Sequence, residues 1–143
     1  TYYLKPEMSA EQVKSSAINF IKDHLPDFIC LNFANPDMVG HTGIPAAILK
    51  ACEKVDQCLE QLFECLDEYN YSVIIIADHG NADKMINDDG SSHTAHTLNM
   101  VPIIVFDKDI QSIKNGKLAD IAPSLLSLMN IKKPKEMSGN SLI

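Results

Sequence analysis

Hydrophobic residues recur every three or four positions in the first part of the chain, which predicts an amphipathic helix over residues 9–24. Its apolar face is formed by Val13, Ala17, Phe20 and Ile21. At its start, Ser9 and Gln12 have the spacing of a capping box, in which each side chain accepts a hydrogen bond from a free backbone N–H. The helix is predicted to end before Pro26, because proline does not continue a helix.

The same periodicity is stronger between Pro45 and Asn70, where it predicts a second, longer helix. Its apolar stripe consists of Ile48, Cys52, Val55, Leu59, Leu62, Leu66 and Tyr69. Proline suits the first turn of a helix, where a backbone N–H has no partner within the helix. A third helix is predicted over residues 118–131.

Three short apolar runs predict strands at residues 28–33, 72–77 and 101–106. Residues 34–43 and 79–100 separate the elements and are predicted to be loops. A long helix joins the first two strands, which is typical of α/β proteins with a mainly parallel sheet. Three strands make a small sheet for this class, so we expect further strands to be missing from this chain.

Composition narrows the class of protein. The 143 residues suit one domain, and 45% of them are hydrophobic, as in ordinary globular proteins. A net charge of −7 argues against non-specific binding to nucleic acid or anionic membranes, since both favour basic surfaces. The four cysteines lack C-x-x-C spacing, and there is no signal peptide or membrane-spanning run, so we expect reduced thiols and a cytoplasmic location. The sequence has no initiator methionine, and we expect it to be cut from a longer protein.

Acidic and imidazole side chains gather in the predicted loops. They are Asp37, His41, Asp78, His79, His93 and His96. In open α/β sheets, ligand sites lie just beyond the carboxyl ends of strands, where these loops begin. Mixed carboxylate and imidazole ligands suit manganese, zinc or iron better than magnesium or calcium. Two such clusters on neighbouring strands predict two cations roughly 3.5–4 Å apart, a spacing that clamps a phosphoryl group.

Each of these side chains also has a simpler interpretation. Asp37 could be a turn residue, because it follows an Asn-Pro pair. The Asp78-His79-Gly80 run could be a helix cap or a turn. His41 could be a surface histidine, and His93 could be solvated or support a ligand. Single residues leave these alternatives open, whereas the whole set at one sheet edge favours a metal site.

Five motifs, in order along the chain, give it a resemblance to the cofactor-independent phosphoglycerate mutases of the alkaline phosphatase superfamily. They are PEMS, NFANPDMVGHTG, ADHGNADKM, HTAHT before VPIIV, and EMSGNSLI. The resemblance implies a three-layer, mainly parallel sheet flanked by helices. Residues 1–143 would be the C-terminal part of that metal-binding domain, without its N-terminal strands and its inserted substrate domain. One departure is Tyr3, where relatives commonly have aspartate, but it lies outside the metal motifs.

The resemblance also implies an activity. The family interconverts 3-phosphoglycerate and 2-phosphoglycerate in glycolysis through a phosphoserine, with two metal ions that are usually manganese. It places the first ion on Asp37, His41 and His96, and the second on Asp78 and His79. The second site also needs an aspartate and the nucleophilic serine from a segment outside this chain. No catalytic residue is therefore assigned here, and the isolated chain is predicted to be inactive.

The resemblance leaves several points open. Another phosphomutase or a metal-dependent phosphatase of the superfamily would share the ligands and differ in the substrate domain. A non-catalytic metal-binding domain is the alternative from a different class. The roles of Asn35, Asn81 and His93 are open, with support of the ligands as the expectation. The expected partner is phosphoglycerate, and the shortened sheet predicts self-association of the isolated chain.

Overall fold

The structure is a computed structural model that describes residues 2–143, which form two compact units. The first unit contains the described residues up to Tyr69 together with His79–Val101. The second contains Asn70–Asp78 and Pro102–Ile143. No helix among residues 2–143 is long and apolar enough to cross a lipid bilayer.

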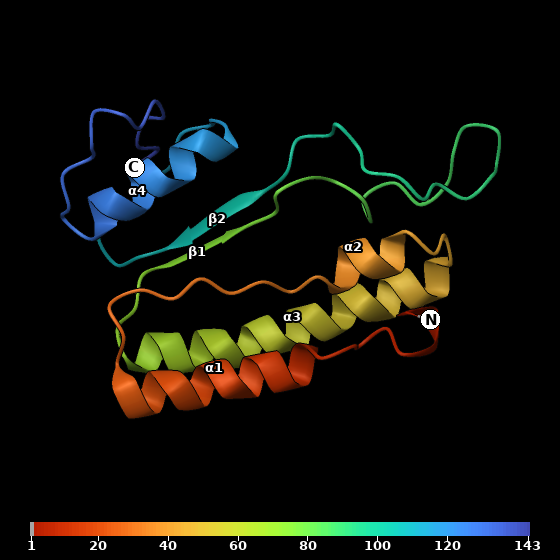
Figure 1. Cartoon of the computed structure of the whole chain (residues 1–143), viewed down its shortest axis with the longest axis horizontal. Helices are drawn as coiled ribbons and strands as arrows, with labels where there is room; N and C mark the ends of the chain where they lie inside the picture. Colours follow the sequence, from red (N-terminus) through yellow and green to blue (C-terminus); the bar gives the residue numbers. More distant parts are fainter. Residues whose placement is uncertain (1) are drawn as a thin grey trace. The chain divides into compact units, whose positions relative to one another are not determined.

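The first unit is built on two helices that lie side by side, α1 (Ala10–His24) and α3 (Pro45–Glu68) (Figure 1). Both confirm helices predicted from the sequence. A short 3-10 helix, Tyr2–Leu4, precedes α1. A short helix, α2 (Asn35–Gly40), also packs against α3. The core between α2 and α3 consists of Val39, Ala47, Ile48 and Ala51.

The predicted capping box at the start of α1 is wrong. Ser9 has φ −107° and ψ 16°, outside the extended region that a capping residue usually adopts, and its side chain makes no capping hydrogen bond. The chain enters α1 through turns instead. The backbone N–H of Ala10 donates to the carbonyl of Glu7 at 3.0 Å. A backbone carbonyl therefore replaces a capping side chain at this end of the helix.

The apolar face of α1 is only partly as predicted. Ile21 is buried, whereas Phe20 is half-exposed. Lys14 is buried although it is charged, and its ammonium group donates to the Glu11 carboxylate and, at 2.6 Å, to the amide oxygen of Gln61 in α3. Because a buried charge is costly unless it is paired, these bonds explain how a lysine can occupy the interface between α1 and α3.

Two segments predicted from the sequence differ in the structure. Residues 28–33 have no strand partner among the described residues and form no regular secondary structure. A strand needs a neighbour that accepts its backbone hydrogen bonds, and the apolar pattern alone cannot supply one. The predicted loop at residues 34–43 contains α2, and proline at its first turn is compatible with a helix.

The second unit has a two-stranded sheet of β1 (Val73–Ile76) and β2 (Ile103–Phe106), followed by the 3-10 helix Leu118–Asp120 and α4 (Ile121–Leu128). These elements confirm the two later strands and the last helix. These two strands are antiparallel, so the mainly parallel sheet expected from the sequence stays a prediction. Two parallel strands need a crossover connection, which is usually a helix. Residues 77–102, which join β1 to β2, contain no helix.

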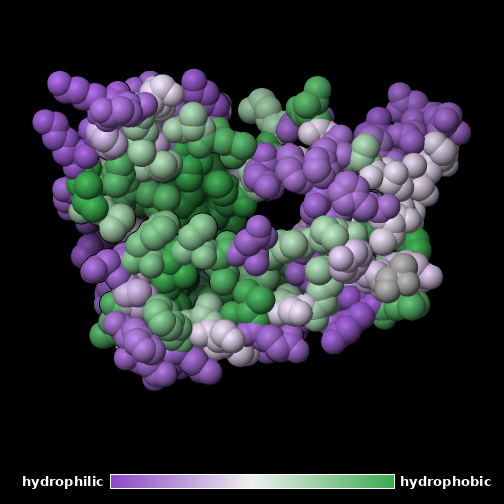
Figure 2. Space-filling view, in the orientation of Figure 1, coloured by the Kyte–Doolittle hydropathy of each residue, from purple (hydrophilic) through white to green (hydrophobic). Residues whose placement is uncertain are grey.

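Large apolar side chains remain at the surface of both units. Phe20 and Phe28 are half-exposed in the first unit, and Ile104 and Phe106 are 45% and 40% exposed in the second. Figure 2 shows hydrophobic residues, in green, over broad areas of the face in view. Exposed apolar area of this kind favours contact with other polypeptide segments.

Candidate metal centre

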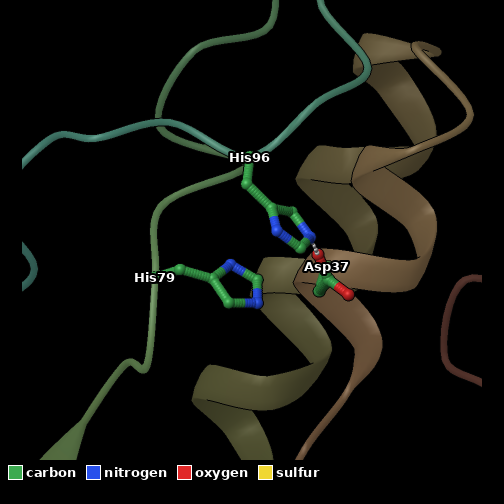
Figure 3. A group of neighbouring side chains, drawn as sticks. All are labelled: Asp37, His79 and His96. Atoms are coloured by element: carbon green, nitrogen blue, oxygen red, sulfur yellow. Dashed lines mark ion pairs between the residues drawn. The ribbon is translucent and has the colours of Figure 1, made fainter.

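Three side chains from separate segments meet in the first unit (Figure 3). Asp37 lies in the first turn of α2, and His79 and His96 lie at two points of the loop that follows β1. Their rings and the carboxylate point toward one another. One ligand atom from each residue lies within 4.8 Å of the others, so this group could hold a metal ion.

His41 adds a fourth side chain beside Asp37 and His96. Its Nε2 lies 3.2 Å from Oδ1 of Asp37 and 3.2 Å from Nε2 of His96. The His96 Nε2 lies 3.0 Å from the same carboxylate oxygen. Ligands at roughly 2.0–2.2 Å from one ion are roughly 3.0–3.5 Å apart, so this triangle fits a shared cation.

A backbone carbonyl fixes which nitrogen of His41 faces the triangle. Nδ1 of His41 lies 2.7 Å from the carbonyl oxygen of Thr94. A carbonyl oxygen can only accept, so Nδ1 carries the hydrogen, and the neutral ring keeps a lone pair on Nε2. That lone pair faces the Asp37 oxygen, which is also an acceptor. Two acceptors facing each other require a proton or a cation between them, and metal-binding histidines commonly have this second bond.

Asn81 orients the carboxylate. It is buried, and its Nδ2 donates to Oδ1 of Asp37 at 2.7 Å and to the main-chain oxygen of Asp37 at 3.3 Å. The approach depends on Gly40, because a Cβ atom there would lie 2.1 Å from Oδ1 of Asn81. The amide thus holds the Asp37 carboxylate, and a supporting role for Asn81 at a metal site stays a prediction.

The rings of His79 and His96 are stacked, with centroids 3.7 Å apart and planes 20° from parallel. The rings of His41 and His96 are 5.0 Å apart and tilted by 44°. Tilted rings can direct their lone pairs to one point, whereas stacked rings present theirs side by side. His79 therefore lies beside the triangle, with a ring nitrogen within 4.8 Å of the ligand atoms of Asp37 and His96.

Asp78 was also predicted to be a ligand. It is exposed and directly precedes His79, but it is grouped with the second unit. Its role as a ligand stays a prediction.

His93 and Asn35, whose roles the sequence leaves open, make other contacts. Nδ1 of His93 lies 2.7 Å from Oδ1 of Asn87, which accepts the hydrogen bond. Nε2 of His93 is buried without a hydrogen-bond partner among the described residues. Asn35 donates to the carbonyls of Pro6 and Glu7 at 2.9 and 2.8 Å, and so ties the start of the chain to α2.

Two further groups close to these side chains have little signal in the sequence. The carbonyl of Thr94 has no signal in a sequence, because every residue has one. Asp83, whose carboxylate accepts hydrogen bonds from Thr97 and Asn99, had only its place in the ADHGNADKM motif as a signal.

The profile of the Metalloenzyme superfamily matches residues 1–133. The chain belongs to the Metalloenzyme superfamily. The chain is 54% identical over its full 143 residues to the 2,3-bisphosphoglycerate-independent phosphoglycerate mutase of Flavobacterium psychrophilum. It is 51% identical to the enzyme of the same name from Aster yellows witches'-broom phytoplasma. The chain spans 28% of the length of these curated relatives.

A solved structure shows the same likeness for the metalloenzyme chain. Leishmania mexicana phosphoglycerate mutase, crystallised at low cobalt concentration, matches 99% of the chain with a TM-score of 0.87 and 28% sequence identity. The match covers 29% of that protein. These comparisons confirm the resemblance to phosphoglycerate mutases that the motifs indicate.

Proposed function

We propose that this chain carries the metal-binding part of a cofactor-independent phosphoglycerate mutase, which interconverts 3-phosphoglycerate and 2-phosphoglycerate. The observation that carries the proposal is the triangle of Asp37 Oδ1, His41 Nε2 and His96 Nε2, with sides of 3.0–3.2 Å. The relatives named above support the choice of substrate. The reaction is a step of glycolysis, so we also propose a cytoplasmic location.

Two divalent ions complete the proposal. The first is assigned to Asp37, His41 and His96, and the second to Asp78 and His79. The ring of His79, stacked on that of His96 with centroids 3.7 Å apart, supplies a further nitrogen donor beside the first set, which supports the assignment of a second ion. The carboxylate and imidazole donors suit manganese, which we propose as the metal. Bound ions of this kind stabilise charge on a transferred phosphoryl group.

The chain's own residues prepare the ligands. The Thr94 carbonyl keeps the hydrogen of His41 on Nδ1, and Asn81 holds the Asp37 carboxylate in place. Ligands fixed in advance need little rearrangement when an ion binds. The nucleophilic serine and a further aspartate are assigned to a segment outside residues 1–143.

The finer description of the fold is part of the same proposal. We propose that residues 1–143 form the C-terminal part of a three-layer domain with a mainly parallel sheet. In that domain a neighbouring strand would supply the ladder that residues 28–33 need.

A manganese titration by calorimetry tests the metal site. We expect the chain to bind about one ion at the first site, and His96→Ala to lose that binding. His24→Ala is the matched control, because His24 lies at the end of α1 with its Nδ1 3.2 Å from the Phe20 carbonyl. Absence of binding to the unaltered chain contradicts the proposed site.

A chimera tests the reaction. Residues 1–143 would replace the matching segment of the Flavobacterium psychrophilum enzyme, and the product would be assayed with 3-phosphoglycerate. We expect turnover of 3-phosphoglycerate that is lost in His96→Ala. An inactive chimera would favour a non-catalytic domain.

A further inference from the structure

One side chain ties together the two loop segments that carry His79 and His96. The Asp83 carboxylate accepts hydrogen bonds from the Thr97 hydroxyl, at 3.2 Å to Oδ1 and 3.0 Å to Oδ2. It also accepts from Nδ2 of Asn99 at 2.5 Å. We call Asp83, Thr97 and Asn99 the Asp83 clasp.

The backbone reinforces the clasp at the same point. Gly80 and Thr97 form an antiparallel bridge, and the N–H of Thr97 donates to the Gly80 carbonyl at 2.8 Å. A Cβ atom at Gly80 would lie 2.1 Å from the Thr97 hydroxyl and 2.7 Å from Oδ1 of Asp83. Only a residue without a side chain lets the two segments come this close.

The clasp adjoins both histidines along the chain. Thr97 follows His96 directly, and Gly80 follows His79 directly. The Asp83 contacts therefore set the separation of the two segments at the point where the stacked rings leave the backbone. Asp83 itself is not in the group of side chains whose ligand atoms meet, so it acts on the histidines through Thr97.

We propose that Asp83 is a positioning residue of the metal centre: acting through Thr97, it holds the His96 ring against the His79 ring. This proposal rests on the metal-binding function proposed above. The hydrogen bonds that its carboxylate accepts from Thr97 and Asn99 stay within the loop, so its effect is local to the loop. Loss of the clasp lets the two segments separate, and the rings then no longer present their nitrogens side by side.

The first test measures manganese affinity of the intact chain by calorimetry. Partners that orient metal ligands typically contribute about 10–100-fold in affinity, so we expect Asp83→Ala to bind manganese about tenfold or more weakly. Thr97→Val, which removes the hydroxyl, should act in the same direction. Asp83→Asn keeps an oxygen that accepts from Thr97, so its loss should be smaller than that of Asp83→Ala. Unchanged affinity in both Asp83→Ala and Thr97→Val overturns the proposal.

Asp89→Ala is the matched control. Asp89 is an aspartate of the same loop whose Oδ1 accepts from the N–H and the hydroxyl of Ser91, so its bonds remain inside its own turn. We expect the manganese affinity of Asp89→Ala to equal that of the unaltered chain. The melting temperature in the presence of a chelator should change no more in Asp83→Ala than in Asp89→Ala. A drop confined to melting temperature, with unchanged affinity, would assign Asp83 a merely structural role.

A second readout separates this proposal from the metal function. The ring protons of His79 and His96 in the metal-free chain report the stacking through ring-current shifts in NMR spectra. We expect these resonances to move in Asp83→Ala and to stay in place in Asp89→Ala. If the unaltered chain binds no manganese, the proposed function fails, and the metal-free spectra still decide the positioning role. If Asp83→Ala fails to fold, the manganese affinity and the ring-proton shifts of Thr97→Val decide the proposal.

Discussion

The side-chain nitrogen of Asn81 lies 2.7 Å from Oδ1 of Asp37, the same oxygen that faces the ring nitrogens of His41 and His96. A carboxylate oxygen has two lone pairs, and the amide N–H occupies one of them. The other lone pair is then directed by the amide toward the two imidazoles. Because Asn81 is buried, this orientation is set within the protein and not by solvent.

Asn81→Ala should therefore weaken manganese binding. Without the amide, the Asp37 carboxylate can rotate, and we expect an affinity loss of about 10–100-fold in calorimetry. Asn115→Ala is the control, because Asn115 is an exposed asparagine of the second unit. Equal affinities of the two variants would contradict the role of Asn81.

The sequence predicted those parts of the fold that local pattern decides. The stripe containing Ile48 and Leu62 identified α3, because helical periodicity is a property of one segment. The antiparallel pairing of β1 and β2 was missed, because pairing depends on the partner strand and the path between them. Residues 28–33 form no strand for the same reason, because no neighbouring strand among the described residues pairs with them.

The site was predictable to a similar extent. Asp37 and His96 are 59 positions apart, and the resemblance to the phosphoglycerate mutases grouped them with His41, whereas residue types and loop positions gave only the larger set of candidates. The sequence could not show that His79 stacks on His96, because that contact depends on the bridge between Gly80 and Thr97.

The contacts of Glu11 between α1 and α3 should make the stability of the fold depend on pH. Hydrogen bonds from Lys14 and Lys54 lower the pKa of Glu11 from 4.5 to about 2. A carboxylate whose pKa is lowered by folding stabilises the fold fully above pH 4.5, and this contribution is lost as the pH falls toward 2. We expect Glu11→Gln to melt at a lower temperature than the unaltered chain at pH 7, with the difference shrinking below pH 4.5.

The control for this experiment is Glu64→Gln, which neutralises an exposed glutamate of α3. Melting curves monitored by circular dichroism give the comparison. A constant difference between Glu11→Gln and the unaltered chain from pH 7 to pH 2 would contradict the assignment.

Asp120 should hold the end of the chain against the start of α4. Its carboxylate accepts from the backbone N–H of Asn140 at 2.8 Å and of Lys117 at 2.9 Å, and these bonds lower its pKa. The N–H of Leu142 donates to the hydroxyl of Ser124 at 2.9 Å. Asp120→Asn removes the charged acceptor, so we expect faster amide hydrogen exchange at Asn140 and Leu142.

The pH dependence of this attachment has the same sign as that of Glu11. The lowered pKa of Asp120 means that the attachment is intact above the ordinary range of aspartate and is lost as the pH falls below it. Ser127→Ala, at an exposed position of α4, is the control for the substitution. Exchange at Asn140 that is unaffected by Asp120→Asn would refute the role of the carboxylate.

The isolated chain should not turn over 3-phosphoglycerate even with manganese present. The proposed reaction passes through a phosphoserine, and the accepting serine is assigned to a segment outside residues 1–143. Without a nucleophile the phosphoryl group has no covalent acceptor. Phosphorus NMR of 3-phosphoglycerate incubated with the chain and manganese gives the measurement. Formation of 2-phosphoglycerate by protein free of host mutase would contradict this prediction.

The isolated chain should also self-associate through its sheet. In the described residues both strands of the two-stranded sheet are edge strands, and β2 has Ile104 and Phe106 at 45% and 40% exposure. Edge strands with apolar side chains favour pairing with another chain, whereas a lysine on an edge opposes it. We expect the mass measured by light scattering to rise with concentration, and Ile104→Lys to abolish the rise. Leu98→Lys, at a fully exposed leucine of the loop, should leave association unchanged, since it removes apolar surface without altering a strand edge. A chain that stays monomeric at every concentration would show that the exposed edges are insufficient for pairing.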